Sequence, residues 1–315
     1  MAFWNACSGV LTVFCLGVLG YLLARANKLP ESLVRILPRF VTTIVLPPYL
    51  LRNITSTFDR DQLLHLVYGL VIPFISIFAV MAFAALLCKV MKVRKGRRGI
   101  FKTAFATSST MNIGLPINVA LFGDASLPYV LLYFLANAVT FWTLGNYFIA
   151  HDGESANVRL FSMQTLKQVC SPPLMGFLLG IVLVLLDVRV PGFIDKSFKY
   201  VGDMAIALSL MYVGVMLNGI SFREVHMGRD EMAVFAGRFL ISPLTVLFLS
   251  FVFPVPALMR NVFIIQSSLP VMMNLAILSG YYKADVKFGT LITSVSTLIS
   301  LVTIPLFMVL IATFL

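Results

Sequence analysis

The stretch TAFATSSTMNIGLPINVALFG, residues 103–123, holds the two features on which the fold of this chain depends. It contains no Asp, Glu, Lys or Arg, and its 21 residues are enough for a helix to cross the hydrocarbon core of a bilayer, which takes about 20. Its middle is polar and ends at Pro116, which removes a backbone donor and clashes with the preceding helical turn. The stretch therefore predicts a membrane span whose helix is broken near its centre.

Nine other runs of similar length lie along the chain, and one of them is interrupted by basic residues, Arg39 and Arg52 among them. The first run is interpreted as a span and not as a signal peptide, because no positive region precedes it. Charged residues make up only 12% of the chain, against about 25% in soluble domains. We therefore expect one all-α integral membrane domain over residues 1–315. The ten predicted spans are 1–24, 33–56, 61–88, 103–123, 125–151, 168–186, 204–222, 239–259, 261–282 and 288–315.

The basic residues are unevenly distributed between the loops. If the N-terminus is outside and the spans alternate, 18 of the 24 lysines and arginines lie inside. Positive residues concentrate on the cytoplasmic side of membrane proteins. The sequence thus predicts a multi-pass protein of the plasma (inner) membrane with both termini outside. The basic segment 89–98 fits either a topology determinant or a contact with anionic membrane lipids, and no nucleic-acid partner is expected.

The two halves of the chain place similar residues at similar positions, about 160 residues apart. Repeat 1 would cover 1–150, a linker 151–170, and repeat 2 171–315. Because each half has five spans, an odd number, the two repeats must have opposite orientations in the membrane, as in many secondary transporters. The matched positions are Gly20 and Gly180, Pro30 and Pro191, Ser108-Ser109 and Ser267-Ser268, Asn112 and Asn274, and Asp124 and Asp285.

The ninth span contains a second polar, Pro-containing break, QSSLPVMMN at 266–274. Irregular backbone at membrane depth survives only where protein or water satisfies it. Two breaks at matching positions of the two halves indicate a transporter binding site near the midplane. The alternative is a pair of Pro-kinked helices without a ligand. Span two has a similar break at Pro47, which is either a plain kink or a part of the site.

Each break leaves a helix N-terminus near the midplane, predicted at 112–116 and 270–274. Such an end carries about half a positive charge and suits a carboxylate. The opposite, negative helix ends could hold Na⁺ or a proton-bearing group. Asn137 would add an amide to the site or make a helix–helix hydrogen bond. The predicted substrate-binding residues are Ser108, Ser109, Thr110, Asn112, Gly114, Pro116, Asn137, Ser267, Ser268, Pro270, Asn274 and Pro47.

Three ionisable residues lie near the ends of predicted spans. Asp203 is a candidate coupling residue or a helix cap, and a pair with Arg52 is expected because both are predicted on the outer side. Arg238 is expected near the inner end of its span, with its charge reaching toward the inner surface. No His, Cys, Asp or Glu constellation of the kind an enzyme needs is present in the sequence, so neither catalysis nor a bound cofactor is expected.

Short motifs along the whole chain resemble the auxin efflux carrier family of membrane transporters. They include GYLLAR (20–25), LPES (29–32), NIGLP (112–116), FWTLG (141–145), GDMA (202–205) and STLISL (296–301). The resemblance implies ten transmembrane helices in two inverted five-helix repeats, with broken, crossing helices 4 and 9. This is a fold like that of sodium/proton antiporters and bile acid symporters. It also implies scaffold and transport subdomains, an elevator-like mechanism and a homodimer. Ser109 stands where the family usually has Asn, so the family's substrate is not carried over.

Together these features predict a secondary active transporter or facilitator of a small organic anion. The substrate class is a mono- or dicarboxylate, auxin-like acids included, and coupling to Na⁺ or H⁺ is open. The alternatives are an anion channel and a membrane-embedded receptor without catalytic activity. A carrier would show saturable flux, which separates it from a channel.

Overall fold

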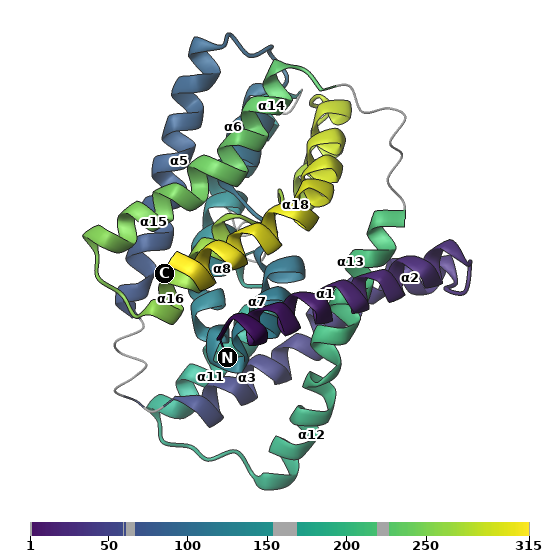
Figure 1. Cartoon of the computed structure of the whole chain (residues 1–315), viewed down its shortest axis with the longest axis vertical. Coiled ribbons are helices and arrows are strands. Elements are labelled where there is room, and N and C mark those ends of the chain that lie inside the picture. Colours follow the sequence, from purple (N-terminus) through teal and green to yellow (C-terminus); the bar gives the residue numbers. More distant parts are fainter. Residues whose placement is uncertain (1, 59, 61–66, 154–168, 219–226, 315) are drawn as a thin grey trace. The chain divides into compact units, whose positions relative to one another are not determined.

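The computed structural model describes residues 2–58, 60, 67–153, 169–218 and 227–314, and within these ranges the chain is helical apart from turns and one isolated β-bridge (Figure 1). Six helices among the described residues are long and apolar enough to cross a membrane. They are Ser32–Thr57, Tyr68–Val90, Asp124–Asp152, Gly192–Met216, Arg229–Val252 and Val286–Ile311. The architecture is therefore all-α and of membrane type.

The other four predicted spans contain shorter apolar helices. Cys15–Arg25, Thr110–Phe122 and Pro172–Leu185 lie in the first, fourth and sixth spans. The ninth is divided into α16 (Ala257–Ser267) and α17 (Asn274–Tyr281). Parts of the predicted third and seventh spans, and most of the predicted linker 151–170, lie outside the described residues.

The chain divides into two compact units that are each built from separate segments of sequence. The first unit contains 1–69, 111–131 and 170–220, and the second contains 70–110, 132–169 and 221–315. The chain passes from one unit to the other within the short helix η3 (Thr110–Gly114) and again within α8 (Leu127–Thr140).

The first unit is held together by two close helix pairs (Figure 1). In one, α1 (Ala2–Arg25) packs on α13 (Met204–Asn218). In the other, α11 (Pro172–Leu185) packs on α3 (Leu46–Thr57). Small residues allow backbones in membranes to approach closely. A Cβ atom added to Gly20 would lie 2.0 Å from the Met211 carbonyl oxygen, and one added to Gly176 would lie 2.4 Å from that of Pro47.

Helices α1 and α11 end in the same way, 160 residues apart. Asn27 after α1 has φ 50° and Asp187 after α11 has φ 52°, a left-handed conformation that Asn and Asp adopt more readily than most residues. Pro30 then precedes α2 (Glu31–Phe40), and Pro191 precedes α12 (Gly192–Gly202). Residues with matching sequence offsets therefore occupy matching local structures in the first unit.

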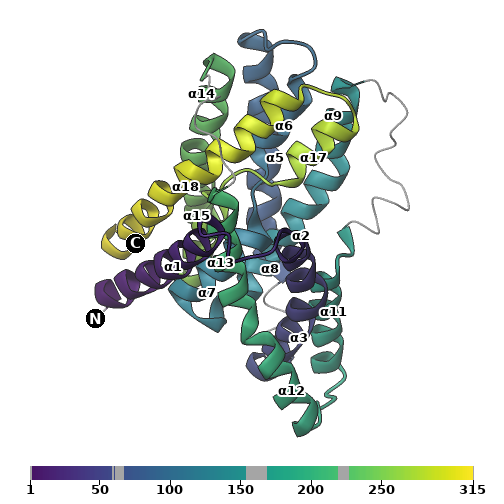
Figure 2. The same ribbon diagram turned by 90° about the vertical axis from the view of Figure 1, so that its right-hand side faces the viewer.

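The second unit contains α5 (Val71–Val90), α6 (Arg98–Ala106), η5 (Phe141–Gly145) and α9 (Asn146–Asp152) from the first half of the chain. From the second half come α14 (Arg229–Ala236), η7 (Gly237–Ile241), α15 (Ser242–Val252), α16, α17 and α18 (Val286–Phe314). Helix α6 packs on α5 and α9, and α17 packs on α18 and α9 (Figure 2). The buried rings of Phe101, Phe105, Tyr133 and Phe263 lie in this core.

Three helices contain a wider, π-type turn immediately before a proline. Helix η1 (Val41–Val45) precedes Pro47, η3 precedes Pro116, and η7 precedes Pro243. Proline has no N–H to donate to the preceding turn, so the hydrogen-bond ladder is rearranged there. These prolines therefore modify their helices without ending them.

Candidate functional site

Two helices of the second unit are interrupted, and the interruptions adjoin each other. Helix α6 ends at Ala106, Thr107 is extended (φ −105°, ψ 143°), and η3 begins at Thr110. The first interruption thus lies at 107–109, upstream of the 112–116 that the sequence predicted. The prediction placed the break at Pro116, but this residue stands in the first turn of α7 (Leu115–Phe122). The N–H groups of a first turn have no partner within the helix, so the N–H that proline lacks costs little stability there. The second interruption, 268–273, falls within the predicted 266–274.

The two interruptions cross in antiparallel fashion. Ser108 and Val271 form an isolated β-bridge, and the Ser109 N–H donates to the Pro270 carbonyl at 2.9 Å. The Ser108 hydroxyl donates to the Gln266 carbonyl at 2.9 Å. Backbone groups freed from the helices are thereby paired with each other, as buried backbone requires.

Asn137 of α8 completes this pairing. Its side-chain oxygen accepts the Ser108 N–H, and its NH₂ donates to the Ser108 carbonyl, both at 2.9 Å. The Asn137 amide therefore makes to Ser108 the two hydrogen bonds that the backbone of a neighbouring β-strand would make. The sequence left two roles open for Asn137, a helix–helix hydrogen bond and a part of the site. The geometry shows that Asn137 supports the backbone of the interruption.

Arg238 was missed by the sequence interpretation, which expected its charge to reach the inner surface. That expectation is wrong, since the side chain is 0% exposed. Its guanidinium donates to the Ser267 carbonyl, to the Ser242 hydroxyl at 2.8 Å and to the Phe105 carbonyl at 3.4 Å. The sequence did contain a signal for a role of Arg238, since this arginine directly precedes the long charge-free run 239–259. An ionisable residue within a membrane usually has a function.

Several polar groups beside the crossing have no hydrogen-bond partner in the part of the chain that the structure describes. They include the Ser109 hydroxyl and the Asn274 side chain. The backbone N–H groups of Met272, Met273 and Asn274, at the start of α17, likewise donate no hydrogen bond there. The first N–H groups of a helix have no partner within it and carry partial positive charge. This end of α17 can therefore accept an anion.

The remaining predicted site residues have other surroundings. Ser267 and Ser268 direct their hydroxyls to carbonyls of their own helix, those of Ile264 and Ile265. The Thr110 hydroxyl lies 3.5 Å from the Asn137 amide nitrogen. Asn112, Gly114, Pro116 and Pro47 belong to the first unit. There, the Gly114 carbonyl accepts the Asn118 amide at 2.7 Å, and the Pro47 backbone packs against Gly176.

The expected pair of Arg52 and Asp203 is not formed. Arg52 binds Asp195 at 3.0 Å, and Asp203 binds Lys199 at 2.8 Å, one helical turn earlier. The i, i+4 spacing explains this choice, since it places Lys199 and Asp203 on one helix face. Asp203 lies on the surface of the first unit, where its side chain is 57% exposed.

An ionic cluster ties together three helix N-termini of the second unit. Arg97, just before α6, binds Asp285 at 2.5 Å and Glu231 of α14 at 3.5 Å. Asp285 also accepts the Phe288 N–H at 3.0 Å, in the first turn of α18. Partial burial works to raise the pKa of Asp285, but the Phe288 N–H and the Arg97 guanidinium outweigh it and hold the pKa below its usual value.

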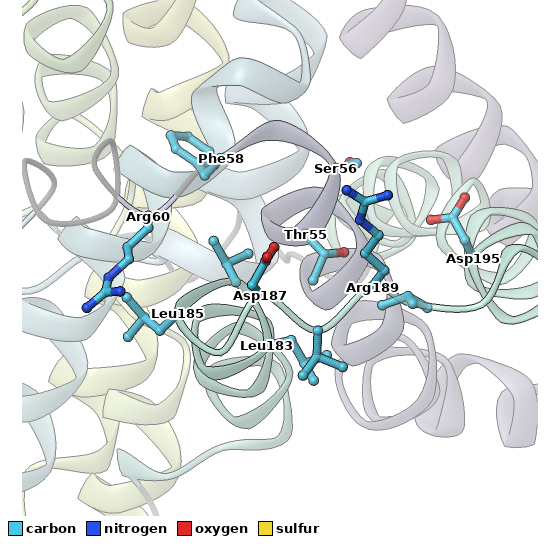
Figure 3. A pocket seen from close by; sticks show the side chains of 12 residues that line it. Thr55, Ser56, Phe58, Arg60, Leu183, Leu185, Asp187, Arg189 and Asp195 are labelled. Atoms are coloured by element: carbon cyan, nitrogen blue, oxygen red, sulfur yellow. The ribbon is translucent and has the colours of Figure 1, made fainter.

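A cavity of about 640 Å³ lies in the first unit, beside the ends of α3 and α11 (Figure 3). Arg60, Asp187, Arg189 and Asp195 line it together with apolar residues of α11. None of the predicted substrate-binding residues lines this cavity.

Comparison with known proteins places the chain in a transporter family. The family described as membrane transport protein matches residues 6–308, nearly the whole chain. The chain belongs to the auxin efflux carrier family. It is 26% identical over 302 residues to an uncharacterized transporter of Methanocaldococcus jannaschii, covering 94% of this chain and 96% of the relative. It is 27% identical over 309 residues to one of Methanothermobacter thermautotrophicus, covering 98% and 99%. The resemblance stated from the motifs is confirmed, and the protein is a membrane transporter by family.

Proposed function

We propose that this transporter is a secondary carrier of a small organic anion, a mono- or dicarboxylate, and that the anion binds at the start of α17. The observation that carries the proposal is the group of unpartnered N–H groups at 272–274 beside the free Asn274 side chain. A carboxylate supplies acceptors for such donors and a charge that complements the helix end. The Ser109 hydroxyl is a further donor, since the Ser109 N–H already holds this residue against Pro270.

The proposed carrier has ten transmembrane helices in two inverted repeats, with the interrupted helices as the fourth and ninth. The matched helix ends at Asn27 and Asp187 support this arrangement. So does the matched packing, in which α1 pairs with α13 and α11 pairs with α3. In the proposed elevator mechanism, the second unit carries the anion and the first is the scaffold. Both termini face outside the plasma membrane, and the carrier is a homodimer.

Ligand binding to the purified protein tests the site. The melting temperature would be followed while a panel of dicarboxylates and indole-3-acetate, with their uncharged amides, is titrated into wild type, Ser109→Ala and Asn274→Ala. At least one acid should stabilise the wild type in a saturable way, and its amide should not. Each substitution removes one hydrogen bond to a charged group, about 1.5–3 kcal/mol, so it should weaken binding about 10- to 100-fold.

The control is Asn218→Ala, which removes an exposed amide at the end of α13 in the first unit. It should bind the acid like the wild type. Equal binding by Asn274→Ala and the wild type would show that the anion site lies elsewhere.

A further inference from the structure

The guanidinium of Arg238 lies between the C-terminal ends of the two interrupted helices. Phe105 is in the last turn of α6, and Ser267 is the last residue of α16. Both carbonyls accept hydrogen bonds from Arg238, which comes from η7 of a third helix. The neighbouring Gly237 allows this approach, because a Cβ atom there would lie 2.1 Å from the Phe105 ring.

A buried cation normally has an anionic partner. Within the part of the chain that the structure describes, no carboxylate lies within 4.0 Å of the Arg238 nitrogens. Each helix C-terminus carries about half a negative charge. Two such ends together carry about one negative charge, which offsets the single positive charge of the guanidinium. The helix ends themselves are therefore the counter-charge of Arg238.

Half-helix C-terminal ends and unwound carbonyls are also the groups that coordinate Na⁺ in carriers with broken helices. Two carbonyls and the Ser242 hydroxyl, 2.8 Å from Arg238, form an oxygen set suited to such an ion. In this protein the guanidinium already occupies that position. One of the guanidinium nitrogens, Nε, is buried and has no hydrogen-bond partner. The surrounding oxygens therefore do not pair all of the donors of the arginine.

We infer that Arg238 is the resident cation of the crossing. It takes the place of a coupling Na⁺, so the wild-type protein binds no free cation there. A neutral side chain at 238 then opens a Na⁺ site lined by the Phe105 and Ser267 carbonyls and the Ser242 hydroxyl. The consequence for coupling rests on the proposed carrier function, but the cation site itself does not.

The test uses the purified full-length protein in detergent and needs no transported substrate. Melting temperatures of wild type, Arg238→Lys and Arg238→Met would be measured as choline chloride is replaced by NaCl at constant ionic strength. Wild type and Arg238→Lys, which both keep the charge, should not respond. Arg238→Met should melt lower in choline and recover with Na⁺ in a saturable way, by about 5 °C at saturation.

Arg52→Met is the matched control, because it removes the same side chain from an ion pair with Asp195 in the first unit. It should not respond to Na⁺. If Arg238→Met is not recovered folded, Arg238→Gln takes its place with the same expectation. Saturable stabilisation of the wild type by Na⁺, or an equal response of the neutral variant in both salts, would overturn the inference. A failure of the proposed anion site would leave these results unchanged.

Discussion

At the scale of single residues, side chains replace the helix as partners of the interrupted backbone. Asn137 pairs both backbone groups of Ser108, and Ser296 of α18 accepts the Val271 N–H at 3.1 Å. Arg238 pairs the Ser267 carbonyl. In a membrane interior an unsatisfied backbone group costs several kcal/mol. These residues therefore permit an irregular segment within the helical core of the second unit.

Asp285 gives a prediction about pH. Its pKa is lowered in the folded state, so its contribution to stability is present above the ordinary aspartate range and is lost as the pH falls through the folded pKa. Asp285→Asn keeps an acceptor for the Phe288 N–H and removes the charge that faces Arg97. At neutral pH the variant should melt about 2 °C below the wild type, and the difference should shrink toward about pH 3.

Thermal denaturation over this pH range measures the effect. Asp187→Asn, at an exposed carboxylate without an ion pair among the described residues, is the control and should show no such pH-dependent difference. A gap between the wild type and Asp285→Asn that stays constant down to acidic pH would contradict the assigned role of the Arg97 contact.

The sequence located part of this chemistry and missed the rest for a physical reason. Ser108, Ser109 and Pro270 were named from local signals, polar residues and a proline inside apolar runs, and they meet at the crossing. Two of the groups that Arg238 binds, the Ser267 and Phe105 carbonyls, lie 29 and 133 positions away in the sequence. Spacing along one helix holds no information on such contacts, so only the tertiary structure could assign its partners.

At the scale of elements, the helix pairs of the first unit depend on close backbone approach. Gly20 allows α1 to touch the backbone of Met211 in α13, whereas a Cβ atom added to Gly17, on the same helix, would meet nothing within 4 Å. The sequence matched Gly20 with Gly180 by offset alone, and the structure gives both a packing role, since Gly180 faces Leu51 and Ile54 of α3. The apolar pattern could not reveal which helix each glycine contacts.

Valine substitutions test this packing. Gly20→Val forces α1 and α13 apart, so the melting temperature should fall by about 5 °C or more. Gly17→Val adds the same side chain to open space and should change it by less than about 2 °C. Similar melting temperatures for the two variants in the same detergent would show that the α1–α13 contact does not need the glycine.

The position of the first interruption was predicted less well than its existence. The proline at 116 was expected to mark the break, but a helix tolerates proline in its first turn and adapts through η3 before it. The extended residues 107–109 carry no proline of their own. Their conformation follows from pairing with 270–271 and with Asn137, which is a property of the fold and not of the local sequence.

At the scale of the whole molecule, the chain is a family member whose two compact units interleave along the sequence. The interruptions, the unpartnered start of α17 and Arg238 all belong to the second unit. An elevator mechanism requires the substrate to be held by one unit that moves as a body. The concentration of these features in one unit is the reason for proposing that it carries the anion.

Transport into proteoliposomes tests the central claim, that the protein is a carrier for a small organic anion held at the start of α17. Uptake of labelled dicarboxylates and indole-3-acetate would be measured with the wild type, Asn274→Ala and Asn218→Ala, with and without unlabelled acid inside. We expect at least one acid to enter with saturable kinetics, faster when the same acid is present inside. Asn274→Ala should lose most of this flux and Asn218→Ala should keep it. Flux of every acid that equals protein-free liposomes, or that rises linearly without acceleration by internal acid, would contradict the account.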